Sequence, residues 1–100
     1  MVRRKFKESP LTQGADEKVP YQLTTTPWGT DPSSPVTTIK DRDGNATSTL
    51  LSTSVTTVSG DVITTPLVQN LVAGNPYTME IKFTVGSTIF EAWGEIKAEA

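Results

Sequence analysis

The chain has 100 residues, of which 35% are hydrophobic and 20% charged, and its formal net charge is −2 at pH 7. This length and composition predict one globular domain with a modest core, and the slight negative charge argues against a nucleic-acid partner. The sequence contains neither cysteine nor histidine, which excludes disulfides and removes the commonest metal ligands and general base, so we expect no cofactor and no metal site.

Targeting signals are not evident. No apolar run approaches the length of a membrane span, and the basic start lacks the apolar stretch that a signal peptide needs. We therefore expect no membrane partner and, outside a virion, a cytoplasmic location.

Residues 1–18 change from basic to acidic and contain Pro10 and Gly14. Because they show no sustained periodicity, they predict a flexible N-terminal arm ahead of one β-sandwich domain over residues 19–100. A basic arm that docks on an acidic partner or on nucleic acid is the less favoured interpretation.

The first strand signal follows this arm. Val19, Tyr21 and Leu23 alternate with polar residues, which predicts a strand of about seven residues. Trp28 lies in the next loop, which is rich in turn formers. Trp28 is either buried in the core or an exposed anchor for a partner, since Trp is enriched at interface hot spots.

Residues 36–40 predict a short strand that ends at an acidic turn, residues 41–45. A calcium loop of the helix–loop–helix type needs Gly at its sixth position, whereas Gly44 would stand at the fourth. A turn between strands explains these residues, and no metal is expected.

The next stretch has less contrast between polar and apolar residues. We expect two short strands near residues 47–51 and 53–58, and another over residues 62–68. Pro66 interrupts the last of these, which indicates an edge position or a bulge because proline cannot donate to a strand ladder.

The clearest signal is a terminal hairpin with strands over residues 77–85 and 88–98, joined at Gly86 and Ser87. Every second residue of its first strand is apolar, which predicts one buried and one solvated face. Pairing across the turn sets Phe83 opposite Phe90, Ile81 opposite Ala92, and Tyr77 opposite Ile96 on one face, and Lys82 opposite Glu91 and Glu80 opposite Trp93 on the other.

The solvated face of the hairpin is the candidate partner-binding surface, formed by Trp93, Glu80, Lys82 and Glu91, with Trp28 as a second aromatic candidate. A tryptophan among charges is a protein-binding anchor, a residue covered by the N-terminal segment, or a ring that stacks on a sugar. We favour a protein partner or a second copy of the chain, as a weak homo-oligomer.

Catalysis is not expected. A nucleophile of the hydrolytic type needs an adjacent base, and the chain has neither His nor Cys. Glu91 and Glu95 lie four residues apart in a strand, about 13 Å, which is too far for a pair of glycosidase carboxylates.

Seven residues before the hairpin resemble a known motif. Residues 71–77, L-V-A-G-N-P-Y, resemble the L-x-P-G-x-x-Y signature of fibronectin type III and related immunoglobulin-like domains, with Ala73 in place of the usual proline. The resemblance implies a structural corner of Leu71, Gly74 and Tyr77, in which the tyrosine hydroxyl bonds to upstream backbone. It also implies that Trp28 is buried.

The strand signals add up to an all-β fold, an immunoglobulin/fibronectin-III-like antiparallel β-sandwich of about seven strands. The layout is similar to small immunoglobulin-like proteins from the tail and tail-fibre regions of tailed phages and prophages. The shared features are the K-E-S-P start at residues 7–10, Trp28-Gly29, the D-x-x-G turn at residues 41–44, V-x-G-D-x-I at residues 58–63, and the corner at residues 71–77.

This resemblance implies a non-catalytic structural or adaptor module of a virion. Its partners would be other virion proteins or host-surface proteins. The alternative is a carbohydrate-binding or adhesion module with the same fold.

Overall fold

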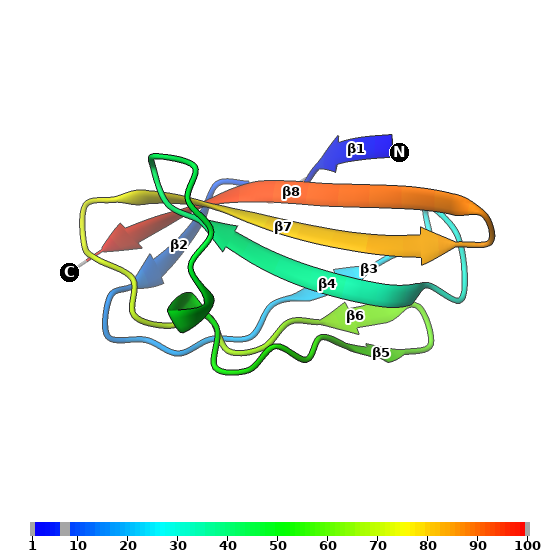
Figure 1. Cartoon of the computed structure of the whole chain (residues 1–100), viewed down its shortest axis with the longest axis horizontal. Helices are drawn as coiled ribbons and strands as arrows, with labels where there is room; N and C mark the ends of the chain where they lie inside the picture. The colour runs from blue at the N-terminus through cyan, green and yellow to red at the C-terminus, as the bar shows by residue number, and fades with distance from the viewer. Residues whose placement is uncertain (1, 7–8, 100) are drawn as a thin grey trace.

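The computed structural model describes residues 2–6 and 9–99, which form two β-sheets packed face to face (Figure 1). The larger sheet has the order β1 (Val2–Lys5), β8 (Thr88–Glu99), β7 (Pro76–Val85) and β4 (Ser33–Lys40), with β2 (Leu11–Gly14) also paired to β8. The smaller sheet has the order β3 (Gln22–Thr24), β6 (Val62–Thr64) and β5 (Thr57–Ser59). The predicted all-β, sandwich-like class is therefore confirmed.

The terminal hairpin forms the centre of the larger sheet. Strands β7 and β8 pair with the register predicted from the sequence, including Phe83 with Phe90 and Glu80 with Trp93. A slip of one residue would have turned the apolar side chains toward solvent, so burial of one face fixes this register.

The core lies between the sheets and takes most of its side chains from the hairpin. Phe83 and Ile96 are fully buried, and Ile63 of β6 meets them from the smaller sheet. The alternate apolar residues of β7 therefore form the face that packs on the smaller sheet. This packing removes their apolar surface from water.

The N-terminal segment is not the flexible arm that the sequence predicts. Strands β1 and β2 both run parallel to β8, so the larger sheet is mixed rather than purely antiparallel. Between them, the Phe6 N–H donates to the Trp93 carbonyl at 2.6 Å, and the Ser9 hydroxyl accepts a hydrogen bond from the Glu95 N–H at 3.0 Å. A basic, weakly alternating segment can form a strand when an existing strand supplies its hydrogen bonds, and its own sequence does not show this.

Phe6 secures this segment on the sheet. It is 9% exposed and packs over Gly94, where an added Cβ would lie 2.5 Å from Phe6 Cδ2. Gly94 thus leaves the space that the Phe6 ring occupies. The strands that the structure describes before position 19 belong to the sandwich itself.

The middle of the chain departs from the predicted strands. Residues 47–51 contain the 3-10 helix η1 (Ser48–Leu50) instead of a strand, and β5 is shorter than the predicted strand. A side-chain hydroxyl adds to the backbone pairing there, because Ser52 Oγ accepts from the Leu67 N–H at 3.1 Å while the Ser52 N–H donates to the Leu67 carbonyl at 2.9 Å.

Strand β6 also corrects the sequence interpretation. It is the central strand of its sheet, with β3 on one side and β5 on the other, so the edge position inferred from Pro66 is wrong. Pro66 lies beyond the end of β6 and therefore removes no donor from its ladder. On the other side, β3 covers fewer residues than the seven predicted, although Val19 still forms an isolated bridge with Val68.

The chain crosses between the sheets just before β7. The Tyr77 hydroxyl accepts a hydrogen bond from the Val72 N–H at 2.8 Å, which is the upstream backbone bond that the sequence predicts. Leu71 is buried at 4% exposure, and Gly74 turns the chain with a φ of 86°, a conformation that favours glycine. The corner therefore combines an apolar anchor, a left-handed turn and one buried hydroxyl.

We expect Tyr77→Phe to lower the free energy of unfolding by about 1–3 kcal/mol, because the ring stays in place while the Val72 N–H loses its acceptor. Denaturant unfolding measures this change. An unchanged midpoint would show that the Tyr77 hydroxyl contributes nothing to stability.

Candidate interaction surfaces

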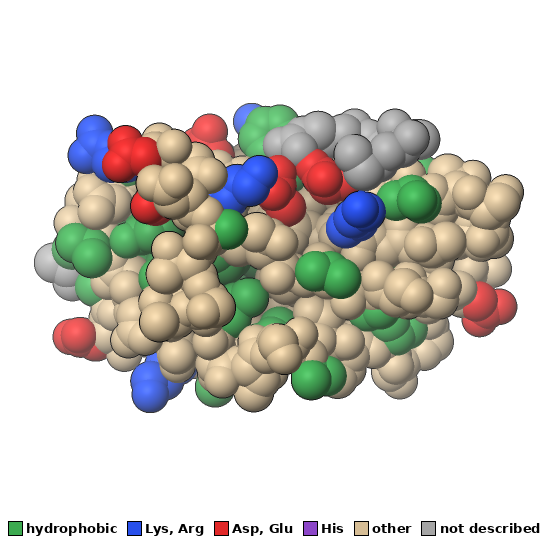
Figure 2. All heavy atoms as spheres, in the orientation of Figure 1, with side chains coloured by type: hydrophobic (Ala, Val, Ile, Leu, Met, Phe, Trp, Pro, Cys, Tyr) green, Lys and Arg blue, Asp and Glu red, His purple; other side chains and the backbone are tan. Residues whose placement is uncertain are grey.

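The outer face of the larger sheet carries interspersed acidic and basic side chains, which Figure 2 shows over β4 and β7. Their alternation follows from the strand geometry, since the neighbouring side chains along each strand point into the core. Lys82 and Glu91 lie opposite each other in the β7–β8 register. The structure thus brings the predicted partner-binding residues of the hairpin onto one face.

Glu80 differs from the prediction that it lies on a solvated face. It is only 9% exposed, and its Oε1 atom lies 3.0 Å from Nζ of Lys40, on β4. The neighbouring strand therefore supplies the partner of this carboxylate. The hairpin sequence alone does not show this pair because β4 lies about forty residues earlier in the chain.

Trp93 is half-buried rather than an uncovered surface ring. Lys5 of β1 pairs with it in register, and the Lys5 Nζ atom lies 5.2 Å from the ring centroid, within the range of a cation–π contact. Of the three interpretations, partial cover by the N-terminal segment describes the structure. Trp93 remains on the outer face, between the inward-facing Ala92 and Gly94.

Trp28 packs against the core. Its ring stacks on Phe83 with a centroid distance of 5.8 Å and on Phe90 with a centroid distance of 6.3 Å. It is half-buried, so the burial that the resemblance implies is only partial. Trp28 therefore acts first as a structural ring and second as a wall of the neighbouring groove.

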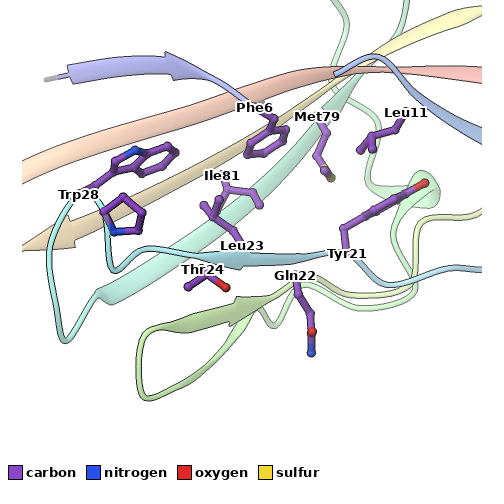
Figure 3. A pocket seen from close by; sticks show the side chains of 10 residues that line it. Phe6, Leu11, Tyr21, Gln22, Leu23, Thr24, Trp28, Met79 and Ile81 are labelled. Carbon is purple, nitrogen blue, oxygen red and sulfur yellow. The ribbon is translucent and has the colours of Figure 1, made fainter. Parts of the chain in front are cut away.

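That groove, the seam groove, opens between the two sheets on the side of β3. Its volume is about 480 Å³, within the range of ligand sites. Figure 3 shows the side chains around it, with Trp28 at one end and Tyr21 at the other. Most of its lining is apolar: Phe6, Leu11, Leu23, Met79 and Ile81.

A buried hydrogen-bond network closes the Tyr21 end of the seam groove. The side chain of Gln13 is 1% exposed, donates to the Val68 carbonyl at 2.8 Å and accepts from the Tyr21 hydroxyl at 2.8 Å. Burial, with a smaller contribution from the Glu17 charge, raises the pKa of the Tyr21 hydroxyl. The hydroxyl therefore stays protonated and donates over a wide range of pH.

Sequence reasoning missed Gln13, because a single glutamine in a polar segment carries no periodic signal. Only the contact between β2 and Val68 gives this side chain its role. The one available indication is that Leu11 and Gln13 share one face of a short alternating segment.

In the acidic turn at residues 41–45, a carboxylate oxygen accepts hydrogen bonds from the backbone of the turn itself. Asp41 Oδ1 accepts hydrogen bonds from the backbone N–H groups of Asp43 and Asn45, both at 2.9 Å. This is the turn that the sequence predicts. Within residues 2–6 and 9–99, no group of three acidic, Cys or His side chains is placed to hold a metal ion.

No protein-family model matches the sequence, and no curated protein or solved structure is significantly similar to it. Among the described residues, no helix has the length and apolar character to cross a membrane.

Proposed function

We propose that this chain is a non-catalytic structural or adaptor module that acts through protein–protein contacts in a phage-type virion. The observation that supports the contact role best is the outer face of the larger sheet, where Trp93 lies among Lys5, Glu80 and Glu91 on paired strands. A half-buried aromatic ring among acidic and basic side chains offers a protein partner both apolar contact area and groups that form hydrogen bonds or ion pairs. The absence of His and Cys from the sequence supports a non-catalytic role.

The fold type is part of this proposal. Strands β4, β7 and β8 facing β3, β6 and β5, with the bonded Tyr77 corner before β7, are the arrangement expected of an immunoglobulin/fibronectin-III-like sandwich. The virion setting rests on the sequence resemblance. Tail-tube or fibre genes beside the gene for this chain would support that setting, and a metabolic operon would contradict it.

Carbohydrate binding is supported less well than protein binding. A sugar stacks on an open ring face, whereas Lys5 lies over the Trp93 ring and Phe83 stacks on the Trp28 ring.

We expect Trp93→Ala to weaken self-association through the outer face, because it removes the largest apolar side chain of that face. Sedimentation velocity across a concentration series measures the association of both proteins. Val55→Ala is the control, since Val55 is 63% exposed and lies outside the larger sheet. A wild-type protein that stays monomeric at every concentration, or equal loss in both variants, would contradict this use of the outer face.

A further inference from the structure

One edge of the smaller sheet has no neighbouring strand in the described part of the chain. Strand β3 is the last in its sheet, and its flanking Tyr21 carbonyl and Thr25 N–H bond toward the β6 side, at 2.9 and 2.8 Å. Because alternate residues of a strand direct their backbone groups to opposite edges, those of Gln22 and Thr24 face away from β6. These groups can therefore pair with an added strand.

Within residues 2–6 and 9–99, no strand covers this edge. Strands β1 and β2, at the nearest edge of the other sheet, pair with β8 and not with β3. Pro20 and Pro27, which have no N–H, bracket the edge and limit it to the residues between them. The open edge thus fits an extended segment of about six residues.

The seam groove lies beside this edge. Leu23 points into it from β3, and Phe6 and Leu11 face it from the N-terminal segment, as Figure 3 shows. A strand added to β3 would lie about 4.8 Å beyond it, with every second side chain directed between the sheets. Apolar side chains of such a strand would enter the groove, which would remove their surface from water.

The two ends of the seam groove differ in charge, which favours one orientation of an occupant. None of the residues that line it in the described chain is charged, which suits apolar side chains in its centre. At one end the guanidinium carbon of Arg4 lies 6.0 Å from the centroid of the Trp28 ring. At the other end the acidic residue Glu17 lies beside Tyr21, because Gln13 donates to the Glu17 carbonyl at 3.1 Å and accepts from the Tyr21 hydroxyl at 2.8 Å. An occupant therefore matches the groove when it is acidic at the Trp28 end and basic at the Tyr21 end.

We propose that β3 and the seam groove bind an extended peptide segment of a protein partner by strand addition. The segment runs antiparallel to β3, with an acidic residue first, apolar residues at two alternate positions, and a basic residue last. Backbone bonds to Gln22 and Thr24 supply the pairing, the groove selects the apolar side chains, and the charges favour one direction. This site is separate from the outer face, so it stands whether or not Trp93 mediates contacts.

A synthetic peptide, acetyl-Glu-Thr-Val-Thr-Ile-Thr-Lys-amide, tests the proposal. Its binding to the full chain is followed by NMR chemical shifts, and amide hydrogen exchange is measured with and without it. We expect the amides of Gln22 and Thr24 to exchange rapidly in the free protein and to become protected in the complex. The amide of Leu23, which faces β6, should change little.

Three further peptides separate the contributions. Proline in place of the central Thr removes a backbone donor and should weaken binding about tenfold or more. Replacing Val and Ile with Ser should abolish detectable binding because the groove then stays empty. Exchanging the terminal Glu and Lys should weaken binding only about two- to fivefold, since exposed charges contribute little.

Matched protein variants test whether the peptide binds at the β3 edge. Thr24→Pro removes an outward N–H from the open edge and should abolish binding of the parent peptide. Val58→Pro makes the same change on the opposite edge of the sheet, where the register with β6 leaves the Val58 N–H facing outward, and should leave binding unchanged. Trp93→Ala should also bind normally, and thermal unfolding of each variant verifies that it is folded.

Several results would overturn the proposal. Binding without protection of Gln22 and Thr24, or equal loss in Thr24→Pro and Val58→Pro, would show that strand addition does not occur. Equal affinity for the parent and the Ser-substituted peptides would show that the groove does not select apolar side chains. NMR chemical-shift changes at the groove with a detergent or a sugar, but not with the peptide, would assign the groove to a small ligand.

Discussion

Phe83→Ala is expected to lower the free energy of unfolding by about 3–5 kcal/mol, the cost of a large cavity in a closely packed core. Phe83 is fully buried, and its ring stacks on Phe90 at 5.5 Å and on Trp28 at 5.8 Å. Trp28 also stacks on Phe90, so the substitution removes one ring of a mutually packed cluster of three that joins the hairpin to the loop after β3. Domains of this size have about 5–15 kcal/mol of stability, so much of the protein should unfold under mild conditions.

Chemical denaturation of Phe83→Ala beside Ile89→Ala measures this effect. Ile89 belongs to the same hairpin but is 41% exposed, so its substitution should cost less than about 1 kcal/mol. A similar loss of unfolding free energy in the two variants would mean that the packed aromatic rings do not make a large contribution to core stability.

Gln13→Leu is expected to be the other large loss, about 2–4 kcal/mol, because leucine can make none of the hydrogen bonds of the glutamine amide. The substitution removes the bonds that Gln13 donates to the Val68 and Glu17 carbonyls and leaves the Tyr21 hydroxyl without its acceptor. The Val68 carbonyl keeps the bond from the Val19 N–H at 3.1 Å, so the main cost is the stranded Tyr21 hydroxyl, since an unsatisfied buried polar group costs about 1–3 kcal/mol. Because Gln13 lies on β2 and Val68 faces it from the opposite side of the sandwich, the loss should also loosen the N-terminal segment.

Two measurements test this role of Gln13. Gln22→Leu, at an exposed position, should change stability by less than about 0.5 kcal/mol. Hydrogen exchange should become faster at β2 in Gln13→Leu and stay unchanged in Gln22→Leu. Wild-type stability and exchange in Gln13→Leu would show that the network is not needed to hold β2.

The outer face and the seam groove give the chain two separate surfaces with different chemistry. The outer face offers fixed charges around Trp93, whereas the groove offers apolar walls beside the open edge at Gln22 and Thr24. A module with both could join two partners at once, which suits the proposed adaptor role. The Trp93→Ala and Thr24→Pro variants separate the two surfaces experimentally.

The sequence by itself determined the terminal hairpin, its register and the corner at Tyr77. These features are local: alternation over residues 77–85 defines the buried face, Gly86 provides the turn, and Val72 is only five residues from the tyrosine that accepts its hydrogen bond. Local patterns suffice where both partners of an interaction lie within one short segment of chain.

Only the tertiary structure decided the contacts between distant segments. The pairing of β1 and β2 with β8, the Lys40–Glu80 ion pair and the Gln13–Val68 hydrogen bond each join residues at least forty positions apart. A basic segment, a glutamate or a glutamine looks solvated in the sequence. It becomes structural when another strand supplies the acceptor, the counter-charge or the apolar cover that its own neighbours lack.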